Sequence, residues 1–266
     1  MSAVSSADAG AVLNAEFRGR GVFVSGGTSG IGAAVARAFA AAGANVVIIG
    51  RRPEAGAAVV EEIQSMGGAC EFIRGDVRES GDIQRAIDIA VRSGGLRAAV
   101  NSAGIFERSM SGRGYSDDAW DEMIATNLTA VFRCVRAEIN AMSGTGGAIV
   151  NIGSSVGHRG SLRASPGYVA AKHGVIGLTR QFALECAGEN IRVNSVSPGP
   201  TLTDMAAPLV AEGPDAVRAT IGQLNPTGRF VDPAVVAAAV LFLCSNAAEG
   251  INGADVAIDG GQLAKL

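Results

Sequence analysis

Short apolar runs of strand length alternate with longer segments of helical periodicity along the chain. The apolar runs are rich in Val and Ile, as buried strands are. They cover residues 21–25, 45–49, 69–74, 97–101, 148–152, 191–196 and 255–258, and helical patterns lie between them, for example at residues 31–42, 53–66, 118–140 and 168–187. This alternation predicts an α/β fold, a Rossmann-like doubly wound parallel sheet of about seven strands with helices on both faces.

The turn after the first predicted strand is rich in glycine. It reads Ser-Gly-Gly-Thr-Ser-Gly-Ile-Gly over residues 25–32 and leads directly into a helical pattern. Glycine lets the backbone approach a pyrophosphate closely, and the free N–H groups of a helix N-terminus attract the anion. A turn of this kind in the first βα unit predicts a dinucleotide site.

Tyr168 and Lys172 are four residues apart within a helical pattern. Residues with this spacing project from the same helix face, which holds a phenol beside an ammonium group. Because a nearby cation favours the phenolate, we expect Lys172 to lower the pKa of Tyr168 and to make it a usable general acid. The same spacing also occurs on solvated helix faces, and the glycine-rich turn decides between the two interpretations.

The charge and hydropathy of the chain argue against several classes of binding partner. The chain has a net charge of −3 and a pI near 5.5, so we expect no nucleic-acid partner. The longest apolar run, residues 234–244, is too short to span a bilayer and predicts a buried helix, so no membrane partner is expected. The first residues lack a secretion signal and the four cysteines are widely spaced, which predicts a cytoplasmic protein with reduced thiols and no metal site.

The chain shows no linker and no internal repeat, so residues 16–266 are expected to form a single catalytic domain. The Ser- and Ala-rich residues 1–15 predict a flexible N-terminal tail. Residues 201–229 contain Pro, Gly and Met and predict a mobile lid over the substrate, although an ordinary surface loop fits the same composition.

Six short motifs occur in the order found in a known enzyme family. The glycine-rich turn has Ser25 where the family has Thr, and Asn101-Ser102-Ala103-Gly104 stands for the family's Asn-Asn-Ala-Gly. The other matches are Asp76-Val77, Asn127, the pair Tyr168 and Lys172, and Pro198-Gly199 followed by Thr201 and Thr203. With these motifs the chain resembles the classical short-chain dehydrogenase/reductase family from about residue 20 to the C-terminus.

This resemblance implies hydride transfer between a nicotinamide cofactor and a small ketone or secondary alcohol. Tyr168 would exchange the proton, Lys172 would bind the nicotinamide ribose, and a serine hydroxyl would stabilise the developing alkoxide. Asn127 would interrupt its helix and hold a water that links Lys172 to solvent. The implied catalytic residues are Asn127, Ser154, Tyr168 and Lys172, and the implied cofactor-binding residues are Gly26, Thr28, Ser29, Gly30, Ile31, Gly32, Arg51, Arg52, Asp76, Val77, Asn101, Ala103, Gly104, Tyr168, Lys172, Pro198, Gly199, Thr201 and Thr203.

The end of the second predicted strand bears on the choice of cofactor. An acidic residue there binds the ribose hydroxyls of NAD, whereas an arginine accommodates the 2′-phosphate of NADP. The chain reads Gly50-Arg51-Arg52, with no carboxylate, which favours NADP. The glycine-rich turn carries no basic residue, so NAD stays possible.

Two adjacent serines compete for the catalytic role. Read forward from the fifth predicted strand, Asn151-Ile152-Gly153-Ser154 matches the family pattern and indicates Ser154. Counted back from Tyr168, the usual spacing indicates Ser155 instead. An insertion in the loop at residues 159–167 reconciles the two counts, because loops accept insertions more readily than buried strand ends do, and Ser154 is therefore favoured.

A non-catalytic dinucleotide-binding regulator on the same fold is the alternative function, and the intact catalytic residues argue against it. We expect residues 107–113, residues 156–167 and the lid to form the substrate pocket. Their composition does not identify a particular substrate. The resemblance also implies a homo-oligomer, in most family members a tetramer.

Overall fold

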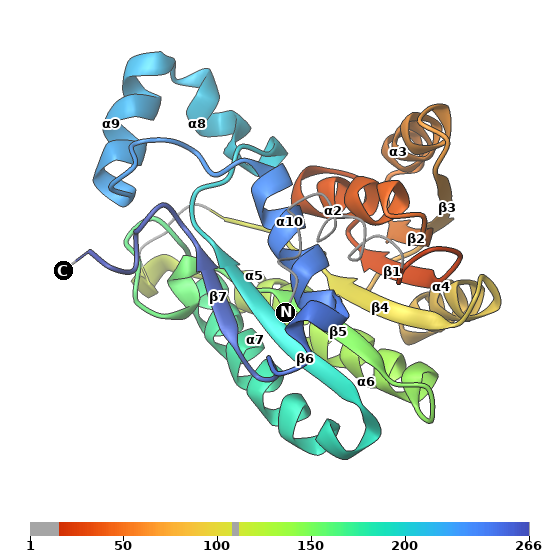
Figure 1. Cartoon of the computed structure of the whole chain (residues 1–266). Helices are drawn as coiled ribbons and strands as arrows, with labels where there is room; N and C mark the ends of the chain where they lie inside the picture. Colours follow the sequence, from red (N-terminus) through yellow and green to blue (C-terminus); the bar gives the residue numbers. More distant parts are fainter. Residues whose placement is uncertain (1–15, 108–111, 266) are drawn as a thin grey trace, which may run out of the picture.

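The strands form one parallel sheet. In the computed structural model, which describes residues 16–107 and 112–265, the strand order is β3-β2-β1-β4-β5-β6-β7 (Figure 1). This confirms the predicted Rossmann-like sheet, and its order reverses between β1 and β4, where such sheets bind ligands. The predicted tail and residues 108–111 of the predicted pocket lie outside the described residues. The strands are β1 (Gly21–Ser25), β2 (Asn45–Gly50), β3 (Ala69–Arg74), β4 (Leu96–Asn101), β5 (Gly147–Ile152), β6 (Ile191–Pro198) and β7 (Asp255–Ile258).

Helices cover both faces of the sheet (Figure 1). Helices α2, α3 and α10 pack on one face, and α4, α6 and α7 pack on the other. None of the helices in the described part of the chain is long and apolar enough to cross a membrane. The α-helices are α2 (Gly30–Ala41), α3 (Pro53–Ser65), α4 (Ser80–Arg92), α5 (Asp117–Ile124), α6 (Ala130–Met142), α7 (Pro166–Glu185), α8 (Ala207–Ala211), α9 (Pro214–Leu224) and α10 (Pro233–Cys244). Single turns of 3₁₀ helix are η1 (Gly112–Gly114), η3 (Ser155–Gly157), η4 (Ala187–Glu189), η5 (Asp204–Ala206) and η6 (Asn246–Ala248), and η2 (Ala125–Thr129) is π-helical.

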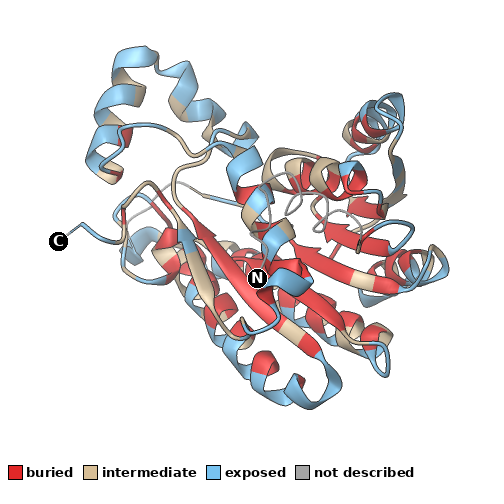
Figure 2. Ribbon diagram, in the orientation of Figure 1, coloured by how far each residue is buried: buried red, intermediate tan, exposed pale blue. Residues whose placement is uncertain are grey.

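Successive residues of the central strands belong to two separate hydrophobic cores. Val22 and Val24 of β1 share a core with α2 and α10, whereas Phe23 shares the other core with α4 and α6. All three side chains are fully buried. A strand points successive side chains to opposite faces, so a sheet covered on both faces needs continuous apolar runs. Figure 2 shows the buried strands lying between helices whose outer faces are exposed.

A row of polar side chains crosses five strands of the sheet. We call Ser25, Asn101, Asn151, Ser195 and Asp255 the polar row, because each lies beside the next in the strand register. Their side chains are buried and hydrogen-bonded: Asn101 donates to Asn151 at 2.9 Å, and Ser195 donates to Asp255. A buried polar group needs such partners, so these bonds link β4 with β5 and β6 with β7 in this register.

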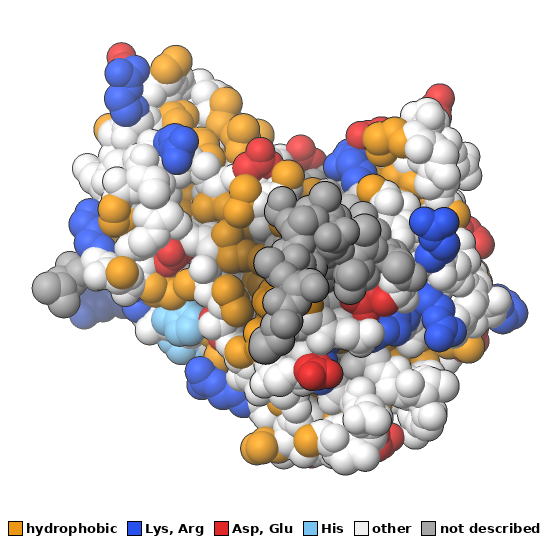
Figure 3. Space-filling view, viewed as in Figure 1, with side chains coloured by type: hydrophobic (Ala, Val, Ile, Leu, Met, Phe, Trp, Pro, Cys, Tyr) orange, Lys and Arg blue, Asp and Glu red, His pale blue; other side chains and the backbone are white. Residues whose placement is uncertain are grey.

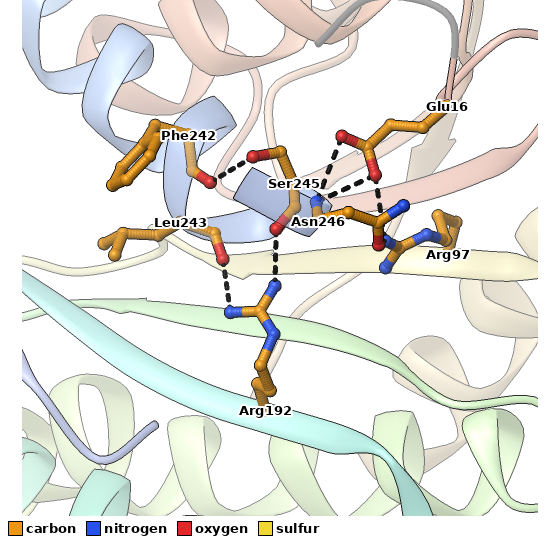
Figure 4. A network of polar contacts seen from close by, with 7 residues as sticks. All are labelled: Glu16, Arg97, Arg192, Phe242, Leu243, Ser245 and Asn246. Atoms are coloured by element: carbon orange, nitrogen blue, oxygen red, sulfur yellow. Dashed lines mark hydrogen bonds and ion pairs between the residues drawn. The ribbon is translucent and has the colours of Figure 1, made fainter. Parts of the chain in front are cut away.

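Arg192, near the start of β6, binds the C-terminal end of α10 (Figure 4). Its guanidinium donates to the carbonyl oxygens of Leu243 at 2.7 Å and Ser245 at 2.9 Å. Arg97 of β4 lies in the same network and pairs with Glu16 at 3.1 Å. A cation that binds the last carbonyls of a helix also interacts favourably with the helix dipole. These contacts tie α10 to the amino ends of the strands.

Glu138 of α6 is a fully buried carboxyl group that contacts the polar row. One oxygen accepts from Asn101 Nδ2 at 3.0 Å, and the other has no partner among the described residues. Burial raises the pKa of Glu138 from 4.5 to about 8. The fold therefore favours the neutral acid, whose contribution to stability is present below pH 4.5 and is lost as the pH rises through about 8.

Replacing this carboxyl group by a neutral amide of similar shape should remove the pH dependence. From pH 5 to 8, the free energy of unfolding of the wild type should fall by about 1 kcal/mol per pH unit relative to Glu138→Gln. Urea unfolding at several pH values in this range measures the difference, with the exposed Glu61→Gln as the matched control. Parallel pH profiles for wild type and Glu138→Gln would contradict the assignment of a neutral acid.

Candidate active site

A cavity of about 940 Å³ lies at the carboxyl ends of the strands. Its walls come from the turns after β1, β2, β3, β4, β5 and β6 and from α8 and α9. In Figure 3, hydrophobic side chains gather between the projection formed by α8 and α9 and the rest of the molecule. The predicted site residues that line the cavity are Gly26, Thr28, Ser29, Gly30, Ile31, Arg51, Arg52, Asp76, Val77, Ala103, Gly104, Asn127, Ser154, Tyr168, Lys172, Pro198, Gly199, Thr201 and Thr203.

Two predicted cofactor-binding residues do not line this cavity. Asn101 belongs to the polar row, and both hydrogen atoms of its amide are used by Glu138 and Asn151. Gly32 lies in the first turn of α2, where a Cβ atom would lie 2.3 Å from the backbone oxygen of Gly26. Both residues therefore lie behind the cavity wall and support the residues that line it.

The glycine-rich turn leaves the N-terminus of α2 open to the cavity. Ser29 is the N-cap residue and makes no side-chain cap, so the first N–H groups of this twelve-residue helix have no capping side chain. Gly26 has φ +68°, and a Cβ atom there would lie 2.6 Å from Ala103 Cα. Only glycine lets the turn pass this close to the strand beside it. The exposed N–H groups and the helix dipole make the turn suitable for a diphosphate.

Tyr168 and Ser154 meet inside the cavity. Tyr168 lies in the first turn of α7, whose N-cap Ser165 accepts from the Tyr168 backbone N–H at 3.3 Å. Burial raises the pKa of the Tyr168 phenol to about 12, and a hydrogen bond with the Ser154 side chain acts in the opposite direction. Phe106 packs edge-on against the Tyr168 ring, with 5.1 Å between the ring centroids. The phenol and the Ser154 hydroxyl can therefore bind one substrate oxygen together.

Lys172 lies one helical turn after Tyr168 and is also buried. Its Nζ donates to the Ile152 carbonyl oxygen at 2.8 Å and lies 5.6 Å from the centroid of the Tyr168 ring. Burial lowers the pKa of Lys172 to about 8. Burial is the main cause of the pKa shift in each group and moves both towards their neutral forms, so the effect of Lys172 on the pKa of Tyr168 stays a prediction.

Ser155 points away from Tyr168. Its hydroxyl donates to Oε1 of Gln262, near the C-terminus of the chain, at 3.1 Å. Ser154 has extended backbone angles, and on an extended segment successive side chains point to opposite sides. Of the two competing serines, Ser154 is the one that contacts the Tyr168 phenol.

Asn127 lies in the π-helical segment between α5 and α6. The interruption predicted for this helix is therefore confirmed, and the pattern read as one helix at residues 118–140 is divided there. Asn127 Oδ1 accepts from the Ile105 backbone N–H at 3.0 Å, and Nδ2 donates to the Met123 carbonyl oxygen at 3.2 Å. A π-turn in a helix often marks a functional position, and this one directs the Asn127 amide to the turn after β4.

Arg51 and Arg52 line the cavity where β2 ends. Arg52 Nη2 donates to Ser29 Oγ at 2.8 Å and lies 3.9 Å from Asp204 Oδ2. Gly50 precedes them because a Cβ atom there would lie 2.6 Å from Cγ2 of Thr28. A larger residue at position 50 therefore requires the Thr28 side chain to move. The Arg52 guanidinium lies beside the glycine-rich turn, and Arg51 acts on Asp76 after β3.

Asp76 lines the cavity after β3, but its carboxylate is already paired. Arg78 contacts both oxygens, with Nη2 at 2.6 Å from Oδ2. This ion pair is the main reason that the pKa of Asp76 is lowered, with a smaller contribution from Arg51. The Asp76 carboxylate is therefore charged and firmly oriented at neutral pH.

The segment predicted as a lid begins and ends at one point. An isolated parallel bridge joins Thr201 to Val231, and the Leu202 backbone N–H donates to the Val231 carbonyl oxygen at 3.1 Å. Between these positions α8 and α9 project from the body of the molecule (Figure 1). Leu209 and Leu224 of this projection line the cavity. The two ends of this segment therefore lie close together, and its residues contribute to the cavity wall.

Sequence reasoning missed two residues of the site. Phe106 contacts the Tyr168 ring, and Gln262, which accepts from Ser155, lines the cavity from the C-terminal segment. No local pattern marks Gln262, because its partner lies 107 residues away in the sequence. Phe106 follows the Asn101–Gly104 motif closely, and this proximity was the only available signal.

Comparisons with known proteins agree with the geometry. A sequence model of the family described as enoyl-(acyl carrier protein) reductase matches residues 26–262. The chain is 39% identical over 245 residues to an A-factor type gamma-butyrolactone 1'-reductase of Streptomyces virginiae, covering 90% of this chain and 93% of that protein. It is 38% identical over 256 residues to a cyclohexanol dehydrogenase of an Acinetobacter species, covering 96% and 99%.

A solved structure shares the whole fold. An actinorhodin polyketide ketoreductase determined with NADPH matches with a TM-score of 0.86 at 31% identity, over 92% of this chain and 98% of that one. Sequence identity at this level across nearly the full length goes beyond a shared fold. Together with the family match, it shows that the chain belongs to the short-chain dehydrogenase/reductase family of oxidoreductases.

Proposed function

We propose that the protein transfers a hydride between NADP(H) and a carbonyl or secondary alcohol substrate, with Tyr168 as the general acid and base. The main support for this proposal is that the Ser154 and Tyr168 side chains contact each other inside a cavity that the glycine-rich turn also lines. The relatives named above are dehydrogenases and reductases, and they give no support to a non-catalytic regulator.

The cavity fits a nicotinamide dinucleotide. The N-terminus of α2 would hold the diphosphate, Asp76 and Val77 would lie beside the adenine, and Thr201 and Thr203 would lie along the nicotinamide half. When bound, the nicotinamide supplies or accepts the hydride. The lining glycines support this fit, because a Cβ atom at Gly26 or Gly30 would lie 3.2 Å or less from neighbouring atoms of the wall.

Residues of the chain itself would transfer the proton to or from the substrate oxygen. At neutral pH the raised pKa of Tyr168 keeps the phenol protonated, so it can donate to a substrate oxygen. Ser154 would donate a second hydrogen bond to the same oxygen and stabilise negative charge as it develops. Lys172 is cationic below about pH 8 and would orient the ribose, with Asn127 supporting the turn after β4.

Arg51 and Arg52 support NADP as the preferred cofactor, with NAD as the alternative. A 2′-phosphate beside them would receive charge-assisted hydrogen bonds, which adenosine ribose hydroxyls cannot match. The ketoreductase structure named above was determined with NADPH. Asp204 lies 3.9 Å from Arg52 and would compete with the phosphate for this guanidinium, which keeps NAD as an alternative.

Three features of the assembly complete the proposal. Residues 16–266 would act as one catalytic domain, and residues 201–229 would act as a lid hinged at the Thr201–Val231 bridge. A cytoplasmic homotetramer is proposed from the family resemblance, and the free cysteines are consistent with a reducing compartment. Light scattering of the purified protein tests the tetramer.

Removing the Tyr168 hydroxyl while keeping its ring tests the general acid. Tyr168→Phe should lower kcat by at least 10²-fold to 10⁴-fold, because proton transfer to the substrate oxygen is lost. Steady-state reduction of a ketone panel with NADPH measures kcat, and fluorescence titration measures NADPH binding, which should stay nearly unchanged. Activity within tenfold of the wild type would refute the role of Tyr168.

The two serines are distinguished by parallel substitutions. Ser154→Ala should lower kcat by roughly 10²-fold, as the loss of one oxyanion donor does, whereas Ser155→Ala should change kcat for a simple ketone much less. Both variants are measured with the same ketone and at saturating NADPH. The opposite ranking would transfer the catalytic role to Ser155.

Cofactor preference is tested at Arg52, whose guanidinium lies beside the glycine-rich turn, because a substitution at Gly50 would also displace Thr28. Arg52→Ala should lower the ratio of kcat/KM for NADPH over NADH by about tenfold or more, because a charge-assisted bond to the 2′-phosphate is removed. The exposed Arg92→Ala on α4 is the matched control. A wild-type enzyme that already prefers NADH tenfold would show that Arg51 and Arg52 do not bind a phosphate.

A further inference from the structure

The segment after β7 brings one glutamine into the cavity. Gln262 is 3% exposed and lies in a tight turn whose base is Asp259. Asp259 accepts from the backbone N–H groups of Gly261 at 2.9 Å and Leu263 at 2.7 Å, and the Gln262 backbone N–H donates to the Asp259 carbonyl oxygen at 3.3 Å. A turn bonded on both sides of a residue holds its side chain in place.

Ser155 determines which end of the Gln262 amide is free. The Ser155 hydroxyl donates to Oε1, which leaves the Nε2 group with its two hydrogen atoms. No acceptor for Nε2 occurs among residues 16–107 and 112–265, and this nitrogen is not one of their fully buried unpaired atoms. Because Gln262 lines the cavity, its amide N–H groups are available to a molecule bound there.

Phe106, Val156, Leu209, Leu224 and Phe230 give the substrate side an apolar wall, and the donors Ser161, Arg163 and Thr220 also line the cavity. Arg163 is exposed and donates to Gln223 at 3.1 Å, whereas Gln262 is buried and held in its turn. Ser154 and Tyr168 are already assigned to the reacting oxygen. A fixed donor in an apolar wall is the arrangement by which a site recognises one polar group on an otherwise apolar ligand.

We propose that Gln262 is a specificity-determining residue that selects substrates with a second oxygen atom able to accept a hydrogen bond. The substrate class is an oxygenated ketone, such as a diketone or a hydroxyketone, or the corresponding diol. Ser155 is the positioning residue that presents the amide nitrogen. This inference rests on the proposed function and adds the substrate class to it.

The test compares substrates of one size with and without the second oxygen. Cyclohexanone is the parent compound, and its 2-, 3- and 4-hydroxy derivatives and 1,4-cyclohexanedione carry the second oxygen at different distances. The measured quantity is the ratio of kcat/KM for the best oxygenated ketone to that for cyclohexanone. In the wild type this ratio should exceed about ten, because an unmade bond to a buried donor is costly.

Gln262→Met keeps the length of the side chain and removes the donor, so the ratio should fall about tenfold. Gln84→Met on the exposed face of α4 makes the same chemical change far from the cavity and should leave the ratio unchanged. Gln262→Glu replaces the donor by an acceptor. It should reduce turnover of the dione more than that of a hydroxyketone, because only the hydroxyketone can donate to a carboxylate.

Ser155→Ala provides a second route if Gln262→Met does not fold. It leaves Gln262 in place but releases its amide, so the ratio should fall severalfold. A ratio within twofold of the wild type in the folded variants would overturn the proposal. So would a rise in KM for NADPH without a change in the ratio, since the amide would then serve the cofactor.

Failure of this inference can be told apart from failure of the proposed function. An enzyme that reduces cyclohexanone and its derivatives with no preference refutes the role of Gln262 and leaves hydride transfer intact. A protein that reduces no ketone and oxidises no alcohol with either nicotinamide cofactor refutes the proposed function itself.

Discussion

Five buried polar side chains stand side by side across a sheet whose buried residues are mostly Val, Ile and Ala. Polar groups removed from water are costly unless they are hydrogen-bonded, so this row tolerates little change in the register of the strands. A slip of one residue would place Asn101 and Asn151 in the opposite, apolar core. The polar row therefore favours this register of the strands, and the site is built at their carboxyl ends.

Two members of the row, Ser25 and Asp255, also contact loops of the site. Ser25 accepts from the Ala103 backbone N–H at 3.3 Å, which joins the turn after β1 to the turn after β4. Asp255 accepts from His158 at 2.7 Å, which joins β7 to the loop that carries the two serines. Catalytic loops are mobile unless such contacts hold them, and precise positioning is most of what this chemistry requires.

The parts of the site that follow from local rules could be predicted from the sequence. The strands could be predicted because short runs of β-branched apolar residues are typical of buried strands. Tyr168 and Lys172 could be paired because residues four apart project from the same face of a helix. The Ser155–Gln262 contact could not be predicted, since it joins positions 107 residues apart through the tertiary fold. Asn101 was placed at the cofactor by its motif, whereas the folded chain uses its amide to connect β4 with β5 and Glu138.

The pKa of Tyr168 shows that burial has to be weighed together with the spacing of charged residues. Spacing predicts a cation beside the phenol, but the burial that brings Lys172 close also removes water from both groups, and desolvation prevails in each. The phenol consequently holds its proton at neutral pH, which suits donation to a carbonyl oxygen. Taking a proton from an alcohol needs the phenolate, which only a further stabilising charge or a higher pH can populate. Burial of the pair thus biases the isolated chain towards the protonated state that carbonyl reduction begins from, and the hydrogen bond from Ser154 opposes that bias.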